Sequence, residues 1–368
     1  MIPLPEGNAI VYCQGAFGTT NGKTAHGLVR RTRRYNVMSV VDARCAGQDA
    51  LELLDGTPSG ITVHGDVRSA FDAAHHSADG TRGPTHLVVG LAPDGGRLPA
   101  EARREIATAL ELGLNVDSGL HDFLSEDPEL AKIAECSGVA IRDIRKPPDR
   151  AQLHFFAGKI EQVDSLKVAV LGTDSAVGKR TTAWLLIDAF NAAGCGAELV
   201  GTGQTAWLQG ARYCIILDSL VNDFVAGEIE HAVWSAWHEV GPDVVVIEGQ
   251  GSLMNPAYPG GHEIIAAGRP DLVVLQHAPC RREYDGFPGY PLHPLPLQIQ
   301  AIELLSGKPV VAIAVNHEGL TSPQTDAAVA AIRSETGLPC CAPLRSGLTP
   351  ILDALLPFTP KRVHHSDE

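Results

Sequence analysis

The chain has 368 residues, which is too long for one hydrophobic core of ordinary size and predicts two domains. It carries 29 Lys and Arg residues against 43 Asp and Glu residues, and the resulting net charge of −14 argues against nucleic acid or an anionic membrane as its partner. No apolar run approaches the roughly 20 residues that span a bilayer, and none of the eight cysteines forms a CxxC pair, so we expect a cytoplasmic protein with reduced thiols.

Short apolar runs alternate with helical patterns over residues 1–148. Such alternation predicts a doubly wound α/β domain with a parallel sheet, because strands buried on both faces are continuously apolar. The predicted strands are 9–13, 37–41, 61–64, 86–90, 115–119 and 138–141, and the predicted helices are 23–34, 67–75 and 100–112.

Two adjacent prolines among charged residues, Pro147 and Pro148, predict a domain boundary, because neither fits inside a helix or a central strand. A second doubly wound α/β domain follows over residues 149–368, and we expect its acidic tail after Pro360 to be frayed. The predicted strands are 166–172, 197–201, 243–248, 271–276 and 309–316, and the predicted helices are 179–193, 222–239, 296–306 and 322–336.

A glycine-rich segment between the first strand and the first helix of this domain predicts a phosphate-binding loop, or P-loop. It departs from the common pattern, because five residues separate its two glycines and Arg180 stands between Lys179 and Thr181. The longer GTDxxxGK form resembles dethiobiotin synthetase and its P-loop relatives. The predicted phosphate-binding residues are Gly172, Thr173, Asp174, Ser175, Ala176, Val177, Gly178, Lys179, Arg180, Thr181 and Thr182. An ordinary strand-to-helix turn with a surface lysine is the alternative.

Two further strand ends carry polar residues suited to a nucleotide. Glu248 follows four apolar residues, and a carboxylate there is a candidate Mg²⁺ ligand together with the Thr181 hydroxyl. Asn316 ends another strand and is a candidate contact for a purine edge. Glu248 could instead cap backbone amides, and Asn316 could be an ordinary turn residue.

The segment after residue 276 predicts a carboxylate and proton-transfer site, because a histidine and two arginines follow a strand. We predict His277, Arg281 and Lys179 as catalytic residues, although a lone histidine is more often structural. Loops after two other strands supply glycines, hydroxyls and amides suited to a polar ligand. The predicted substrate residues are Gln204, Thr205, Gln250, Gly251, Ser252 and Arg282.

A second glycine-rich loop, 15–24, lies in the N-terminal domain, but its spacing is not that of a clean P-loop. Asp42 ends the next strand, as a ribose-binding acid does in dinucleotide folds. The GxGxxG pattern is absent, so an NAD site is weakly supported.

Taken together, these motifs resemble the DgcN-like family, long catalogued as a domain of unknown function. The resemblance implies an N-terminal Rossmann-like domain, a C-terminal P-loop domain and transfer of an acetyl group from acetyl-CoA to the amine of D-glutamate. It rests on the segments 23–28, 40–43, 172–182, 202–205, 248–252, 256–258 and 275–279, with Arg281. The family usually has His before its Pro-Ala-Tyr segment, whereas this chain has Asn255, which cannot take a proton at neutral pH.

Three hypotheses for the function follow. In the first, an N-acetyltransferase uses His277 as the base and holds the phosphates of CoA in the P-loop. In the second, an ATP- and Mg²⁺-dependent ligase or kinase activates a carboxylate or carbamate through Lys179, Thr181 and Glu248. In the third, the chain is a nucleotide-dependent binding or regulatory protein that binds a nucleotide without catalysing a reaction. The expected partners are a small anionic substrate, such as an acidic amino acid, and further copies of the chain.

Overall fold

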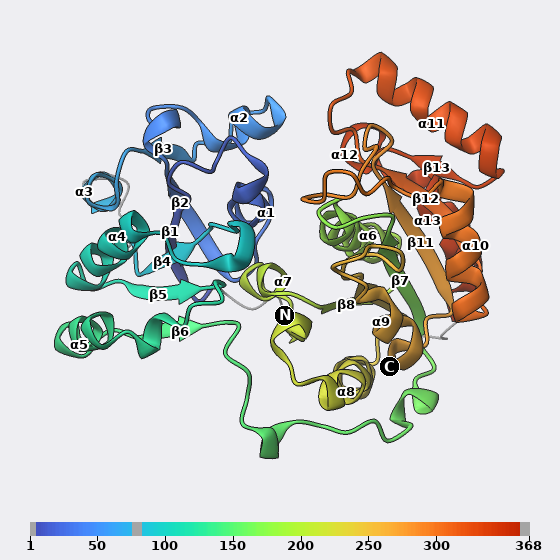
Figure 1. The fold of residues 1–368 in the computed structure, drawn as a ribbon, viewed down its shortest axis with the longest axis horizontal. Helices are drawn as coiled ribbons and strands as arrows, with labels where there is room; N and C mark the ends of the chain where they lie inside the picture. Colours follow the sequence, from blue (N-terminus) through green and yellow to red (C-terminus); the bar gives the residue numbers. More distant parts are fainter. Residues whose placement is uncertain (1–4, 76–82, 361–368) are drawn as a thin grey trace, which may run out of the picture. The chain divides into compact units, whose positions relative to one another are not determined.

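The chain divides into two compact units in a computed structural model that describes residues 5–75 and 83–360 (Figure 1). Unit 1 comprises Met1–Pro147 and Gln204–Ala211, and unit 2 comprises Pro148–Gly203 and Arg212–Glu368. The acidic tail whose fraying the sequence predicts lies outside the described residues. The return of residues 204–211 to unit 1 is a feature that the sequence pattern does not predict.

The sheet of unit 1 is parallel throughout and has the strand order β3-β2-β1-β4-β5-β6. This order reverses beside β1 and is that of a Rossmann-type sheet. The strands are β1 (Gly7–Tyr12), β2 (Tyr35–Val41), β3 (Thr62–His64), β4 (His86–Val89), β5 (Asn115–Ser118) and β6 (Ile141–Asp143).

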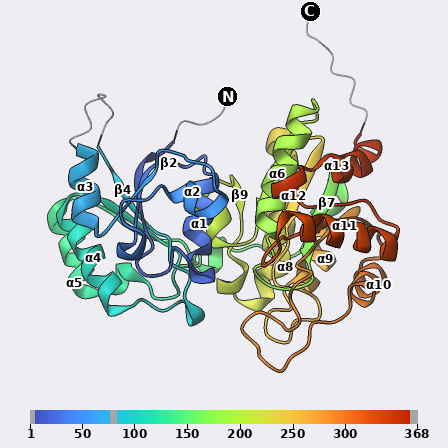
Figure 2. The same cartoon turned by 90° about the horizontal axis from the view of Figure 1, so that it is seen from above.

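Helices cover both faces of this sheet. The contacts place α3 beside α4 and α4 beside α5 on one face, whereas α1 packs with α2 on the other (Figure 2). The helix α1 also packs with α7. The helices are α1 (Lys23–Arg30), α2 (Ala50–Asp55), α3 (Val67–His75), α4 (Ala100–Glu111), α5 (Pro128–Ser137) and α7 (Gln204–Leu208).

Unit 2 contains a second parallel sheet, with the order β13-β12-β11-β7-β10-β8-β9. Its central strand β7 is buried along its whole length, as the continuous apolar run predicts. The strands are β7 (Leu166–Gly172), β8 (Ala197–Gly201), β9 (Tyr213–Cys214), β10 (Val244–Glu248), β11 (Leu272–His277), β12 (Val310–Val315) and β13 (Cys340–Cys341).

The helices of unit 2 form two layers around its sheet. Figure 2 shows α6 and α13 on one side and α8, α9 and α10 on the other, and the main apolar core of the unit lies under the second layer. The helices are α6 (Lys179–Ala192), α8 (Asn222–Val240), α9 (Gly261–Gly268), α10 (Leu295–Ser306), α11 (Ser322–Thr336), α12 (Pro343–Ser346) and α13 (Thr349–Leu355). No helix in the described parts of the chain is long and apolar enough to cross a membrane.

One predicted strand is wrong in position. The sequence predicts a strand over 138–141, but Gly138 ends α5 in the left-handed conformation, with φ of 67°, and β6 begins only at Ile141. Glycine adopts this conformation at little cost, so it terminates the helix here instead of opening a strand. The helix that it terminates, α5, is absent from the sequence prediction.

Candidate phosphate and substrate site

The predicted phosphate-binding segment connects the central strand β7 to α6. We call residues 172–178 the phosphate loop. Gly178 is its last residue and has φ of 105°, a conformation that side chains disfavour. A Cβ atom at Gly172 would lie 2.8 Å from the Cδ of Lys179, so this glycine makes room for the lysine to fold back over the loop.

Lys179 is buried, and its ammonium group joins two loops. Its Nζ donates to the Asp174 carbonyl and to the Gly251 carbonyl, at 2.7 Å in both cases. Gly251 follows β10 and has φ of 55°, and a Cβ atom there would lie 1.7 Å from the Tyr258 carbonyl oxygen. The loop after β10 therefore needs glycine at this position to reach the lysine.

Asp174 is a buried carboxylate on which three loops converge. Its Oδ1 accepts from the Ser175 amide at 2.7 Å and from Asn255 Nδ2 at 2.9 Å. Its Oδ2 accepts from Arg281 Nη1 at 3.0 Å and from the Asp285 amide at 2.9 Å. Because a buried charge is stable only when it is paired and hydrogen-bonded, this arrangement fixes the phosphate loop to the loops after β10 and β11.

Asn255, which stands where the family usually has histidine, serves as a connector. Its Nδ2 donates to Asp174, and its Oδ1 accepts from the Ala257 and Tyr258 amides, each at 2.9 Å. The amide can do both at once because it carries a donor and an acceptor on one planar group.

His277 ends β11 beside the phosphate loop. Its Nδ1 is hydrogen-bonded to the Thr173 hydroxyl at 3.0 Å. Burial lowers the pKa of His277 from its ordinary value of 6.5 to about 4, so the imidazole is neutral at neutral pH. The preceding residue, Gln276, accepts a hydrogen bond of 2.5 Å from Thr182, which ties α6 to the same strand end.

The predicted Mg²⁺ ligand Glu248 lies at the carboxyl end of β10. Burial raises its pKa, while the positive charges of Arg180 and Lys179 and a hydrogen bond from the Thr202 amide, 3.0 Å long, act in the opposite direction. Thr181 lies half-buried on the first turn of α6. The described residues contain no group of three or more His, Cys, Asp or Glu side chains that could hold a metal ion.

The predicted substrate residues divide between the two units. Gln250, Gly251 and Ser252 follow β10 in unit 2, and Arg282 is exposed next to Arg281. Within the described parts of the chain, the buried Ser252 hydroxyl has no hydrogen-bond partner. Gln204 and Thr205 belong to α7 in unit 1, where the Thr205 hydroxyl is hydrogen-bonded to Thr24 at 2.8 Å.

In unit 1, Asp42 is engaged with its own loop. Its Oδ2 accepts from the Phe17 amide at 2.9 Å and its Oδ1 from the Arg44 amide at 3.0 Å. Asp42 is 1% exposed, and it supports the glycine-rich loop 15–24 through the Phe17 amide and the turn that follows β2 through the Arg44 amide.

Two acidic residues beside the phosphate loop of unit 2 are absent from the sequence prediction. The Oε2 of Glu318 accepts a hydrogen bond from Arg281 Nη2 at 2.9 Å, and the Oδ2 of Asp285 accepts one from the Ser175 hydroxyl at 3.4 Å. They lie in the loops after β12 and β11. The carboxyl ends of parallel strands meet at one edge of a sheet, so their positions after strands are the signal that could have found them.

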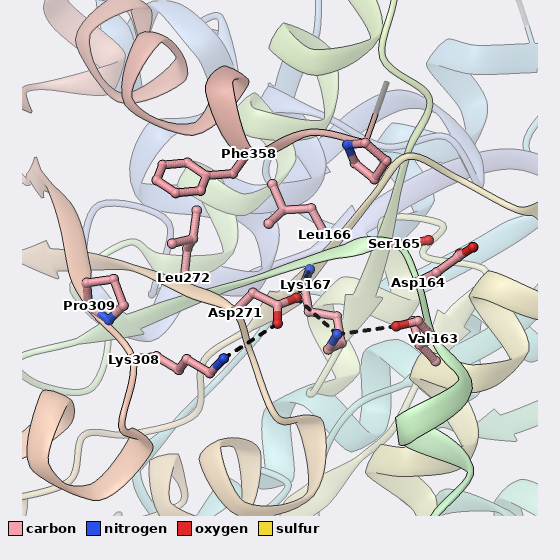
Figure 3. Close-up of a pocket in the computed structure, with 11 residues that line it drawn as sticks. Val163, Asp164, Ser165, Leu166, Lys167, Asp271, Leu272, Lys308, Pro309 and Phe358 are labelled. Atoms are coloured by element: carbon pink, nitrogen blue, oxygen red, sulfur yellow. Dashed lines mark hydrogen bonds and ion pairs between the residues drawn. The ribbon is translucent and has the colours of Figure 1, made fainter. Parts of the chain in front are cut away.

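A hollow of about 510 Å³ in unit 2 lies at the amino-terminal ends of β7, β11 and β12, opposite the phosphate loop (Figure 3). Lys167 and Lys308 point toward Asp271 there, with N–O distances of 3.0 and 3.9 Å. None of the predicted site residues lines it. Ligands of parallel sheets bind at the carboxyl ends of strands, so we place the candidate site at the phosphate loop and not in this hollow.

Comparisons with known proteins match one family model to each of two parts of the chain. A family model described as "Domain of unknown function (DUF1611_N) Rossmann-like domain" matches residues 43–147, and one described as "Domain of unknown function (DUF1611_C) P-loop domain" matches residues 154–352. They confirm the predicted order of a Rossmann-like and a P-loop domain.

Curated and solved relatives cover most of the chain. A D-glutamate N-acetyltransferase from Tritonibacter scottomollicae is 32% identical over 286 residues, which are 74% of this chain and 81% of the relative. A D-glutamate N-acetyltransferase from Pseudoalteromonas sp. is 30% identical over 73% of this chain and 81% of the relative. A crystal structure of a DUF1611 family protein from Anabaena variabilis is 31% identical, with a TM-score of 0.86 over 95% of this chain and 99% of that chain.

These matches confirm the family resemblance predicted from the motifs, and the relatives' names agree with the prediction of a transferase. The chain belongs to the DUF1611 family, in which a Rossmann-like domain precedes a P-loop domain.

Proposed function

We propose that this protein is an N-acetyltransferase that moves the acetyl group of acetyl-CoA to the amine of D-glutamate or a similar acidic amino acid. The relatives named D-glutamate N-acetyltransferase support this reaction class. The observation that carries the proposal is the pair formed by His277 and Thr173, because it places a neutral imidazole directly on the phosphate loop.

His277 is the proposed general base. A proton on its Nδ1 donates to the Thr173 oxygen, which leaves Nε2 as the acceptor. The amine nitrogen of the amino acid attacks the thioester carbonyl, the N–C bond forms, and the C–S bond breaks. His277 takes the proton from the attacking nitrogen and returns it to the departing sulfur, so CoA leaves as the thiol.

The phosphate loop is the proposed site for the phosphates of CoA. Its amides, the N-terminus of α6 and the Lys179 ammonium are the groups that fit a phosphate. Acetyl-CoA supplies the acetyl thioester, and the loop orients it toward His277. Arg282, which is exposed beside the site, is the proposed contact for the carboxylates of the acceptor, with Gln250, Gly251 and Ser252 as further contacts in unit 2.

An ATP- and Mg²⁺-dependent ligase or kinase is the second candidate. It is favoured by the buried Glu248 at the carboxyl end of β10, because burial raises its pKa while the nearby Arg180 and Lys179 oppose that shift and a bound cation would do the same. In that reaction Glu248 and the Thr181 hydroxyl would hold Mg²⁺.

One experiment separates the candidates. The protein is incubated with D- or L-glutamate and either acetyl-CoA or MgATP, and free thiol and phosphate are followed. We expect thiol release that depends on D-glutamate and is lost in Lys179→Ala. Lys308→Ala is the matched control, because it removes a lysine at the end of the unit 2 sheet opposite to the phosphate loop. Phosphate release that needs an acceptor supports the ligase, and tight nucleotide binding without turnover supports a binding protein.

Two further predictions accompany this function. We propose that the protein works as a homo-oligomer, which light scattering tests directly. We also propose a cytoplasmic location, which fits its eight free cysteines.

A further inference from the structure

Three consecutive carbonyl groups of the phosphate loop are held by side chains from other loops. Arg281 donates to the Ser175 carbonyl at 2.7 Å and to the Ala176 carbonyl at 3.3 Å. Asn316 Nδ2 donates to the Val177 carbonyl at 2.9 Å. The two side chains thus fix three successive peptide units.

This arrangement determines where the amides of the same peptide units point. The chain has no cis peptide bond in its described parts, and in a planar trans peptide the N–H points away from the C=O. The amides of Ala176, Val177 and Gly178 therefore face away from Arg281 and Asn316. Ala176 and Gly178 have positive φ angles, of 51° and 105°, and such alternation curves a run of amides into a concave site for an anion.

Arg281 has no donor left for a substrate. A guanidinium carries five N–H groups. Two from Nη1 go to Asp174 and Ser175, two from Nη2 to Ala176 and Glu318, and the Nε group also goes to Glu318. The sequence predicts Arg281 as a catalytic residue or a clamp for the substrate carboxylate, but its donors are all committed to the protein.

The ion pair with Asp174 explains why Arg281 keeps this position. The Asp174 side chain is 0% exposed and that of Arg281 is 12% exposed. Asp174 is held in turn by Asn255 and by the Asp285 amide, so the arginine approaches a carboxylate that is fixed. A guanidinium suits such a site because its planar fork bonds several fixed acceptors together.

We propose that Arg281 and Asn316 are positioning residues, which orient three amides of the phosphate loop toward a diphosphate-bearing ligand before it binds. Asn316 thereby acts through the loop and not through a purine edge. The inference rests on the proposed function only in that the loop receives phosphate groups.

Binding of CoA and of inorganic pyrophosphate, measured by calorimetry, tests this inference without reference to catalysis. Arg281→Gln and Asn316→Asp each remove a donor to the loop carbonyls. We expect both to weaken both probes about tenfold or more, because a lost charge-assisted contact frees the peptide to rotate. With acetyl-CoA saturating, the KM for D-glutamate stays within about twofold of the wild-type value.

Arg281→Lys separates positioning from folding. It keeps a charge beside Asp174, but one ammonium cannot span two loop carbonyls and Glu318 as the fork does. We expect wild-type thermal unfolding with the same loss of CoA binding. Arg212→Ala is the matched control, because that arginine pairs with Glu239 on the surface. It should bind both probes like the wild type.

Two results overturn the inference. One is a wild-type protein that binds neither probe. The other is an Arg281→Gln variant that keeps its CoA affinity, whether or not its KM for D-glutamate rises. A wild-type protein that binds both probes but acetylates no amino acid ends the proposed function and leaves this inference to be judged on binding alone.

Discussion

His277 provides a pH test at the scale of one residue. Burial lowers its pKa in the folded protein to about 4, below the 6.5 of an unfolded histidine. Between about pH 6.5 and 4 the folded state thus binds fewer protons than the unfolded state. The contribution of His277 to the free energy of unfolding is therefore fully present above about pH 6.5 and is lost as the pH falls toward 4. We expect its ring C–H resonance, followed by NMR, to titrate near pH 4.

His277→Gln identifies this resonance by removing it. In the same series, the fall of unfolding stability between pH 6.5 and 4 should be smaller in His277→Gln than in the wild type. A titration midpoint near 6.5 would contradict the neutral base of the proposed function, because the imidazole would then be partly charged near neutral pH.

Ser252 links stability to binding. Its hydroxyl is buried without a partner in the described chain, and such a group costs about 1–3 kcal/mol. Ser252→Ala should therefore leave the free energy of unfolding unchanged or raise it. If the hydroxyl is kept for a ligand, the same variant raises the KM for acetyl-CoA or D-glutamate severalfold.

Ser165 is the matched control, since it is also a buried serine of unit 2 but donates to the Pro242 carbonyl at 2.5 Å. Ser165→Ala should lower stability by about 1 kcal/mol and leave both KM values unchanged. Chemical denaturation and steady-state kinetics measure both variants. Unchanged KM values in Ser252→Ala would remove Ser252 from the substrate site.

At the scale of elements, the segment before β7 is held on α8 by acidic side chains. Glu230 is buried, and it accepts from the Ala157 amide at 2.7 Å and the Ile160 amide at 3.2 Å. Glu230→Ala leaves both amides without this acceptor and should cost about 1–3 kcal/mol of unfolding free energy. Glu239→Ala, which removes an exposed ion pair with Arg212 and a hydrogen bond from the Tyr213 hydroxyl, should cost about 1 kcal/mol.

Hydrogen exchange localises this effect. Peptides covering residues 150–163 should exchange faster in Glu230→Ala and as in the wild type in Glu239→Ala. Equal losses of stability in the two variants would mean that the buried carboxylate contributes no more than a surface pair.

The strands and long helices were predictable because they carry strong local signals. β7, β8 and α11 match their predicted ranges, since continuous apolar runs and a 3.6-residue period need no knowledge of the fold. The short elements were missed. The helix α7 has five residues and the strands β9 and β13 have two each, so their conformation depends on tertiary contacts and not on local pattern.

The positions of loop 172–178 and of His277 at strand ends were likewise predictable from the sequence, but the contacts of Arg281 were not. Its partners Asp174 and Glu318 lie 107 and 37 residues away along the chain. Sequence spacing identifies an arginine near the site. Only the folded structure tells whether its donors remain for a substrate or are committed to the protein.

At the scale of the whole molecule, the chain leaves unit 2 after Gly203, adds α7 to unit 1 and returns at Arg212. Trp207 anchors this excursion. The guanidinium carbon of Arg34 lies 3.7 Å from the centre of the Trp207 ring, and that of Arg142 lies 4.6 Å from it. Arg34 also donates a hydrogen bond to the Trp207 carbonyl. Gln209 adds hydrogen bonds to the carbonyls of α1 and Arg31. Unit 1 therefore depends on residues that are distant in sequence.

Trp207→Ala tests this dependence in the full chain. Removing the ring takes its packing and two cation–π contacts, each about 0.5–2 kcal/mol, from unit 1. Amide hydrogen exchange of β1 should therefore accelerate, while that of β7 stays unchanged. Trp234→Ala is the matched control, because it removes a tryptophan that lies under Lys159, at 4.7 Å, in unit 2. If Trp207→Ala leaves the exchange of β1 at the wild-type rate, unit 1 is stable without this anchor and the 204–211 excursion has no structural role in it.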